Sequence, residues 1–344
     1  MITSFDFARL ADVVYSEVIS KNEYKKLKIK NINIISENSD YLFYKLNSFN
    51  LKSGDVIYTH TGNLLNLFTI LKKVPEDFEL SLISHQSDRP INKALFSMKP
   101  KCIKRWYGIN IDYLSNILHP IPLGIANENY KNKNLVKSEL VFPRTDSFFM
   151  RKKNLLYVNF SIQTNYSERS WVKQYFKKFP WAVVEEEQLT LDEYKDKIKN
   201  SNFVLCPWGN GIDSHRIWET LSVGSIPIVK NHNTFKTLDF LPFLSVEDFK
   251  LINENLLIEK LINLKEKEYN FSKLDIEFWS KEIRNKTSAN SLEIEIQESQ
   301  IISKMYLIKG RIINFKTKKK KKLQYFYRKI SKVFKLITSR YENK

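Results

Sequence analysis

A short stretch near position 210 gathers the residue types that bind anionic ligands. In "CPWGNGIDSHRIWETLSVGSIPIV", residues 206–229, a glycine-rich loop leads into residues with helical spacing and then into an apolar strand. Glycines allow close approach to the backbone, and a helix N-terminus carries unpaired N–H groups and about half a positive charge. With His215 and Arg216 beside it, this loop is predicted to bind phosphate oxygens. Glu219, one turn further on, suits sugar hydroxyls.

The helix expected at 215–223 has two different faces. At 100° per residue, one face is apolar and is expected to pack on a sheet: Ile217, Trp218 and Leu221. The opposite face is polar and is expected to be open to a ligand: His215, Glu219 and Ser222. Asp213 or Ser214 can cap this helix. The alternative is that Glu219 pairs with Arg216 and that the glycines only form a turn.

The surrounding sequence alternates strand-like and helix-like segments, as parallel α/β folds do. In the first half we expect strands at 31–36, 54–60 and 78–84, with a helix after the second. A polar stretch at about 127–150 is the expected connection. The second half predicts strands at 155–160, 181–186, 203–207 and 226–229, with helices at 168–178, 190–200, 215–223 and 254–266. Two doubly wound domains would bring the ends of their strands to a shared cleft.

The segment "FVLCPWGNGIDSHRIWETLSVGSIPIV" resembles the nucleotide-sugar-binding segment of exostosin-like glycosyltransferases, of the bacterial or viral type. The spacing from Glu219 to Gly224 is similar to a segment shared by many GT-B transferases. Weaker similarity covers "LISHQSDRPI", "IKRWYGIN" with "HPIPLGIAN", and "YVNFSIQTNYSER". The resemblance implies a GT-B fold of two Rossmann-like, doubly wound α/β domains facing a central cleft. The expected domains are an acceptor-side domain at 1–140, a nucleotide-sugar-binding domain at 150–285, and a basic helical tail at 286–344.

The resemblance also implies roles for particular residues. Those expected around the nucleotide-sugar donor, a substrate rather than a cofactor, are Asn159, Arg169, Gly209, Asn210, Gly211, Asp213, His215, Arg216 and Glu219. Arg169 is the candidate for the pyrophosphate, and a solvated arginine at a helix start is the alternative reading. No metal is implied, and the sequence has no Asp-x-Asp motif to hold one.

Transfer with inversion needs a base beside the acceptor hydroxyl. Asp88 and His85 follow the strand "LSLIS" and are the candidate catalytic residues, while His60 competes with them. Asp88 could equally cap a turn, and lone histidines are often structural. A retaining mechanism would need no such base.

The net charge of +18 resides largely in the C-terminal tail. Residues 314–338 combine lysines with apolar residues at helical spacing, which predicts contact with an anionic membrane surface. Docking of this tail on the protein's own core is the alternative. No specific binding of nucleic acid is expected, since no base-stacking motif accompanies the lysines.

The sequence therefore predicts a metal-independent glycosyltransferase that transfers a sugar, from a UDP-sugar or similar donor, to a hydroxyl of a glycan or lipid-linked acceptor. No apolar run is long enough to cross a bilayer, and both cysteines suit a reduced compartment. The expected location is the cytoplasm, peripheral on the inner face of the membrane, in polysaccharide biosynthesis. The alternatives are a basic binding module for nucleic acid or anionic polysaccharide, and an enzyme that transfers a phosphoryl or phosphosugar group.

Overall fold

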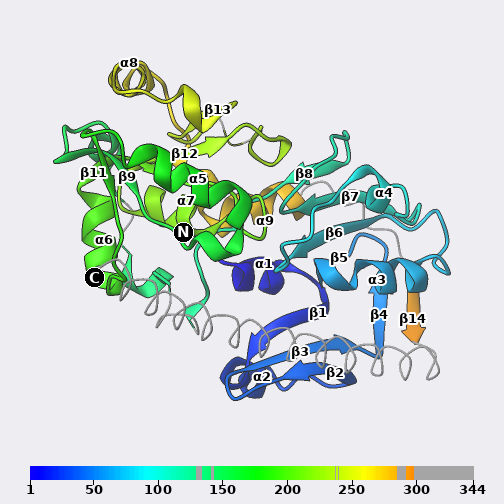
Figure 1. Ribbon diagram of the computed structural model, residues 1–344. Helices are drawn as coiled ribbons and strands as arrows, with labels where there is room; N and C mark the ends of the chain where they lie inside the picture. Colours follow the sequence, from blue (N-terminus) through cyan, green and yellow to red (C-terminus); the bar gives the residue numbers. More distant parts are fainter. Residues whose placement is uncertain (129–133, 141–142, 237, 239, 285–291, 298–344) are drawn as a thin grey trace. The chain divides into compact units, whose positions relative to one another are not determined.

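The computed structural model describes residues 1–128, 134–140, 143–236, 238, 240–284 and 292–297 (Figure 1). The chain divides into two compact units, each defined by the contacts within it. The larger unit contains Met1–Glu17 and Asn50–Glu295, and the smaller one contains Val18–Phe49 with the end of the described chain. All residues discussed below as a candidate site belong to the larger unit.

The first half of the larger unit is built on parallel strands in the order β1-β5-β6-β7-β8. Their bounds are β1 Val13–Ser20, β5 Val56–His60, β6 Leu80–His85, β7 Ile103–Gly108 and β8 Leu118–Pro120. The helices are α1 Ser4–Leu10, α3 Leu64–Leu71 and α4 Lys93–Phe96. Every residue of β6 is buried, as expected for a central parallel strand. We call this part the first lobe.

The second half carries a separate parallel sheet in the order β10-β9-β11-β12-β13, which we call the second lobe. The strands are β9 Asn154–Val158, β10 Ala182–Val184, β11 Ser201–Leu205, β12 Ile226–Lys230 and β13 Leu244–Val246. The helices are α5 Tyr166–Phe176, α6 Leu191–Lys199, α7 His215–Ser222 and α8 Glu254–Lys265. The strands and helices expected between 155 and 266 are confirmed, with ends shifted by at most a few residues.

The α/β class with parallel sheets is thus confirmed for the described chain. The strand expected at 31–36 also exists, as β2 Ile32–Glu37, but the expectation that it belongs to a parallel βαβ unit is wrong. It forms an antiparallel hairpin with β3 Tyr41–Leu46 in the smaller unit, which also holds α2 Lys21–Leu27. A three-residue connection between β2 and β3 is too short for a parallel crossover. A further two-stranded sheet pairs β4 Ser48–Lys52 with β14 Glu293–Gln297.

Helix α9, Ile276–Arg284, follows the second lobe in sequence but packs into the core of the first. Trp279 and Ile283 are buried there, and the Trp279 ring lies 6.1 Å from that of Phe7. Arg284 donates hydrogen bonds to Asp12 and to the backbone oxygen of Leu10. The predicted boundary at 285 assigns this helix to the second domain, whereas its apolar side chains complete the first lobe.

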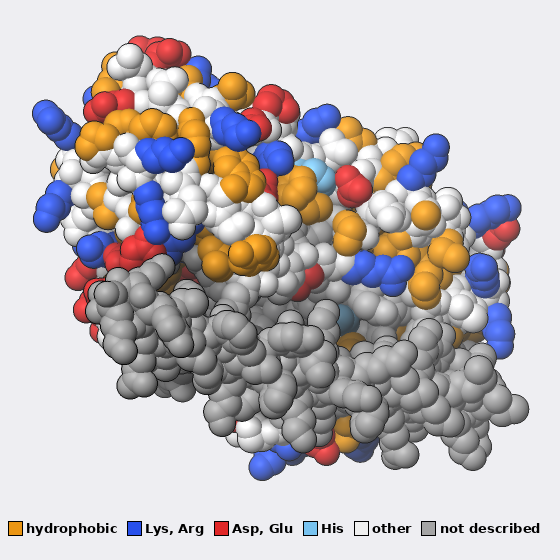
Figure 2. Space-filling model, in the orientation of Figure 1, with side chains coloured by type: hydrophobic (Ala, Val, Ile, Leu, Met, Phe, Trp, Pro, Cys, Tyr) orange, Lys and Arg blue, Asp and Glu red, His pale blue; other side chains and the backbone are white. Residues whose placement is uncertain are grey.

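The predicted basic tail at 286–344 lies outside the described residues except for 292–297. In the described part of the chain, no helix has the length and apolar character required to span a membrane. On the face drawn in Figure 2, lysines and arginines are scattered among apolar and neutral side chains. They do not form one continuous basic groove on the part of that face that the described residues make up.

Candidate functional site

The loop 206–214 begins at the end of the buried strand β11, and Arg169 of α5 binds its backbone. The guanidinium donates from Nε to the Trp208 carbonyl oxygen at 2.8 Å and from Nη2 to the Pro207 carbonyl oxygen at 2.8 Å. Its Nη1 donates to the Ser161 carbonyl oxygen and to Thr164 Oγ1. Four of the five N–H donors of Arg169 are therefore used within the protein. Burial, and then the nearby Arg216, lower the pKa of Arg169 to about 10.

The same loop is fastened to the first lobe by Asn110, which follows β7. The Asn110 Oδ1 atom accepts hydrogen bonds from the backbone N–H groups of Ile212 and Asp213, at 2.9 and 2.8 Å. Its Nδ2 donates to the Ser87 carbonyl oxygen at 3.1 Å. Asn110 is buried and has a φ of 54°, a left-handed conformation that asparagine tolerates better than most residues. One amide thus connects the ends of β6 and β7 to the glycine-rich loop.

Asp213 makes a second connection between the lobes. Its Oδ2 accepts a hydrogen bond from the Leu123 backbone N–H at 3.0 Å, and its Oδ1 accepts one from Trp218 Nε1 at 2.9 Å. The side chain is buried, and burial raises its pKa to about 7 against the opposing effect of these donors. Asp213 therefore fixes the start of α7 and does not cap it.

The N-terminus of α7 faces this junction without a side-chain cap. Ser214 occupies the N-cap position, but its hydroxyl makes no capping bond and has no partner among the described residues. His215 donates from Nδ1 to the Gly124 carbonyl oxygen at 2.8 Å, and no described residue bonds its Nε2. The indole N–H of Trp208, in the loop just before, is buried without a partner. Unpaired donors at a helix N-terminus are suited to an anion.

Glu219 is buried, with 4% of its surface exposed, so the expectation that Glu219 and Ser222 are open to a ligand is wrong. Ser222 is buried as well and bonds the Glu219 carbonyl oxygen. The Tyr194 hydroxyl of α6 donates to Glu219 Oε2 at 3.0 Å and accepts from Arg216 Nη1 at 3.2 Å. Burial alone would lower the pKa of Arg216, but Tyr194, Cys206 and Glu219 together raise it. Arg216 and Glu219 are therefore connected, as in the alternative given above, but through the Tyr194 hydroxyl that lies between them.

Asp88 lies across from the loop, beyond the end of β6. A Cβ placed on Gly211 would lie 3.0 Å from Asp88 Oδ1, so a larger residue here would force the Asp88 carboxylate to shift. No described residue donates a hydrogen bond to the Asp88 carboxylate, and its side chain stays exposed. Loss of surrounding water raises the pKa of Asp88, and the nearby His215 partly opposes this shift.

The two histidines proposed near Asp88 have structural partners. His85 is fully buried, its Nε2 lies 3.1 Å from the Pro122 carbonyl oxygen, and its Nδ1 accepts from the Gln86 N–H. Burial lowers the pKa of His85 to about 3. His60 accepts the Gly62 N–H, and burial lowers its pKa to about 4. Neither imidazole has the open nitrogen that a base requires, while Asp88 has an open carboxylate.

The remaining candidates lie around the loop. Asn159 follows β9 and donates to the Tyr157 hydroxyl at 3.0 Å. The backbone N–H of Gly209 donates to the Gly211 carbonyl oxygen, and Asn210 is exposed at the tip between them. The structure brings Asp88, Gly211, Asp213 and His215 together, and it places Arg169 and Glu219 in buried supporting positions.

Three residues important to this geometry were not predicted from sequence: Asn110, Tyr194 and Trp208. Asn110 follows a strand end, which is a detectable signal at the edge where parallel sheets bind ligands. Trp208 lies in the glycine-rich loop itself, so the sequence alone shows that it is close to the other loop residues. Tyr194 is twenty-two residues before Arg216 on another helix, and no local pattern connects them.

The raised pKa of Asp213 predicts a pH dependence of stability. An ordinary aspartate ionises near pH 4, so between about pH 4 and 7 the unfolded chain loses a proton that the folded chain keeps. Stability is then full below pH 4 and falls by up to about 1.4 kcal/mol per pH unit towards pH 7. Denaturant unfolding of wild type and Asp213→Asn across this range should show the slope in the wild type alone. Parallel curves for the two proteins would contradict the assignment.

The fold and the site define an α/β protein with a strand–glycine loop–helix element at the end of a parallel sheet. Residues 152–298 match the family model described as the RXYLT1 C-terminal domain, a xylosyltransferase-related family. This match covers the second lobe and supports a glycosyltransferase-related family, consistent with the exostosin-like resemblance. No curated protein sequence matches the chain. No group of three or more metal-ligating side chains occurs among the residues that the structure describes.

Proposed function

We propose that the protein is a nucleotide-sugar-dependent glycosyltransferase whose donor diphosphate binds at the N-terminus of α7. The observation that supports this most is the uncapped start of that helix, with the unbonded Ser214 hydroxyl and Trp208 indole N–H beside it. This element lies inside the matched segment 152–298. The N–H groups and the helix dipole stabilise the negative charge of the diphosphate in this site, so its binding needs no metal.

Asp88 is the proposed base for the acceptor hydroxyl. Its carboxylate is unpaired among the described residues and lies against Gly211, beside the proposed diphosphate site. Asn110 and Asp213 hold this side of the loop, so the base and the donor keep a fixed separation. Arg169 and Glu219 act through the loop and through Tyr194, in place of the direct donor contacts expected from the sequence.

The finer assignments extend this proposal. A UDP-linked donor, a glycan or lipid-linked acceptor and a GT-B arrangement follow from the exostosin-like resemblance. A peripheral position on the inner face of the membrane, through residues 314–338, and a role in polysaccharide biosynthesis follow from the basic tail. The tail residues lie outside the described part of the chain.

The donor site is tested by changing the helix cap alone. Ser214→Asp supplies a capping carboxylate, which stabilises the start of α7 and repels a diphosphate. We expect UDP, tested with EDTA present, to raise the melting temperature of the wild type and of Ser214→Asn. For Ser214→Asp the affinity for UDP should fall at least about tenfold, with no loss of stability. Equal UDP affinity in wild type and Ser214→Asp would exclude the site.

A further inference from the structure

Two neighbouring strand ends in the first lobe carry residues in the left-handed backbone conformation. Gln86 follows β6 with a φ of 61°, and Asn110 follows β7 with a φ of 54°. The other described non-glycine residues with a positive φ, Lys28 and Asn31, belong to the smaller unit. Asparagine adopts this conformation more readily than glutamine, for which it costs free energy that the surrounding structure must supply. Strain of this kind gathers at functional sites, so the contacts that hold Gln86 bear on the function of this site.

Two imidazole rings hold the backbone of Gln86, one at its N–H group and one at its carbonyl oxygen. The N–H donates to His85 Nδ1 at 2.8 Å. The His60 ring also bonds the Gln86 backbone, and since this bond raises the pKa of His60, the ring is its donor. His60 and His85 are paired across β5 and β6, so both rings lie at the same edge of the sheet. The Gln86 side chain donates to Ser4 Oγ at 3.2 Å, which adds a third fixed contact.

The hydrogen bonds of the two rings determine where each carries its proton. His85 Nδ1 accepts the Gln86 N–H, so His85 Nε2 is protonated and donates to the Pro122 carbonyl oxygen. His60 Nδ1 accepts the Gly62 N–H, so His60 Nε2 is the donor to Gln86. Burial lowers the pKa of His85 to about 3 and that of His60 to about 4, so both rings are neutral near pH 7. The two histidines that lack an open nitrogen are therefore fixed hydrogen-bonding groups around Gln86.

The turn that begins at Gln86 carries Asp88. The Ser87 carbonyl oxygen accepts from Asn110 Nδ2 at 3.1 Å, and the Ile91 N–H donates to the Asn110 carbonyl oxygen at 2.9 Å. The turn is thus fixed at its start by the histidines and further along by Asn110. No hydrogen bond from a described residue contributes to the pKa of the Asp88 carboxyl. An open carboxylate on a fixed turn is oriented before a substrate arrives.

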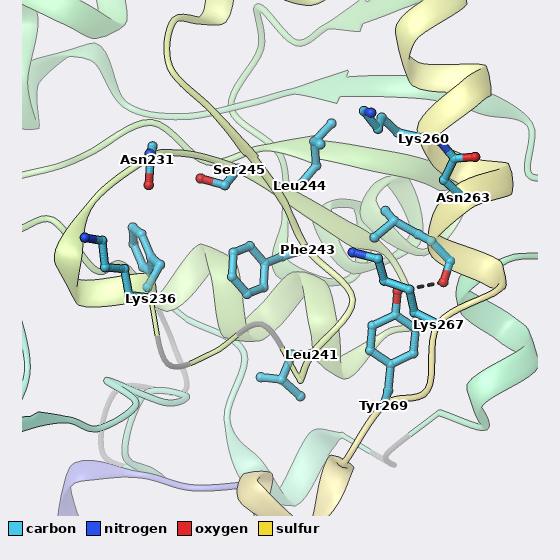
Figure 3. A pocket seen from close by; sticks show the side chains of 12 residues that line it. Asn231, Lys236, Leu241, Phe243, Leu244, Ser245, Lys260, Asn263, Lys267 and Tyr269 are labelled. Carbon is cyan, nitrogen blue, oxygen red and sulfur yellow. Dashed lines mark hydrogen bonds between the residues drawn. The ribbon is translucent and has the colours of Figure 1, made fainter.

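The cavity drawn in Figure 3 does not account for the strain at Gln86. Its described lining comes from the second lobe, around β13 and α8, and includes no residue of the turn 86–91. A functional side chain, by contrast, must be held close to its productive geometry by the residues around it. Gln86 and its partners form a connected set with the turn that carries Asp88, and this connection gives the strain a reason.

We propose that His60 and His85 hold Gln86 in its left-handed conformation and that Gln86 thereby directs the Asp88 carboxylate towards Gly211. Gln86 and the two histidines are positioning residues, which act through Asp88. An extended residue at position 86 would change the path of the turn and move the carboxylate away from Gly211. This role rests on the proposed function, in which Asp88 is the base.

Variants at position 86 test this role through their backbone preferences. Glycine adopts the left-handed conformation freely, whereas β-branched valine is an outlier there. We expect Gln86→Val to lower kcat, measured as UDP release, at least about tenfold, while UDP affinity stays within about twofold of the wild type. Gln86→Gly should keep kcat within about fivefold of the wild type. The matched control Lys28→Val places valine at a left-handed position of the smaller unit and should leave kcat unchanged.

Variants of His85 test the contact that holds the Gln86 N–H. His85→Phe keeps a ring beside Phe7 but leaves this N–H without an acceptor, and we expect kcat to fall at least about tenfold. His85→Asn supplies an amide oxygen as the acceptor and should restore most of the lost activity. If His85→Phe does not fold, the variants at position 86 decide. Wild-type kcat in Gln86→Val, or an equal fall in its kcat and UDP affinity, would overturn the proposed role.

The state of the two rings is measured without activity, by NMR of the full chain with ¹⁵N-labelled histidine. At about pH 5, where an ordinary histidine is mostly charged, His60 and His85 should be neutral with the proton on Nε2. Loss of one signal in His60→Gln and of the other in His85→Asn assigns them. Charged rings, or a proton on Nδ1 of His85, would overturn the proposal. If the wild type releases UDP from no sugar nucleotide, the proposed function fails, and the ring protons alone decide whether the histidines hold Gln86.

Discussion

We expect Asp88→Asn to lower the rate of the proposed sugar transfer by about 10²- to 10⁴-fold, the range for loss of a general base. The amide keeps the shape of the side chain beside Gly211 but cannot accept the acceptor proton. UDP affinity and melting temperature stay within error of the wild type, because the carboxylate has no described hydrogen-bond partner to lose. The measurement is UDP release from whichever sugar nucleotide stabilises the wild type.

The pH profile provides a second check on Asp88. The base must be ionised, and its raised pKa places the acidic limb of kcat/KM above that of an ordinary aspartate. This limb should disappear in Asp88→Asn, while Asp77→Asn, an exposed carboxyl elsewhere in the first lobe, keeps the wild-type profile. If Asp88→Asn retains full turnover and His215→Gln loses it, the base is the open Nε2 of His215.

We expect Arg169→Lys to destabilise the protein by about 2–6 kcal/mol, because it leaves at least two buried carbonyl oxygens without a donor. A lysine cannot reproduce the planar donors that reach the carbonyl oxygens of Ser161, Pro207 and Trp208. Each carbonyl left unpaired costs about 1–3 kcal/mol. Urea unfolding measures the loss, and Arg151→Lys, an exposed arginine, serves as the control.

The same variant distinguishes the two readings of Arg169. A structural role predicts the loss of stability with a smaller effect on UDP affinity, caused by movement of the loop. Unchanged stability with a tenfold or greater fall in UDP affinity would instead favour the direct pyrophosphate contact expected from the sequence.

Local patterns predicted β9, β10, β11 and β12 well, because each is a short, largely apolar run bounded by polar or glycine residues, whereas the three-residue β13 was not predicted. β11 and β12 are fully or almost fully buried, so their composition alone reveals them. β1 was missed because its burial varies along the strand and its sequence "VVYSEVIS" mixes polar residues with apolar ones. The antiparallel pairing of β2 was missed because periodicity reports a strand and not its partner.

At the candidate site, the sequence identified the loop but not the direction of its side chains. Helical spacing placed His215 and Glu219 on one face, yet Glu219 is covered by Tyr194, whose position depends on how α6 packs beside α7. The spacing also gave no reason to expect that Arg169 would use its donors on the loop backbone. Such contacts depend on tertiary structure, which residues close in sequence do not encode.

Helix α9 has a consequence for how the chain is made. Trp279 and Ile283 complete a core that also contains Phe7 and Tyr58. During synthesis, the ribosome must therefore finish nearly the whole described chain before the earliest residues gain their final neighbours. A fragment ending before Ile276 would expose that apolar surface, so truncations designed at the apparent end of the second sheet should aggregate.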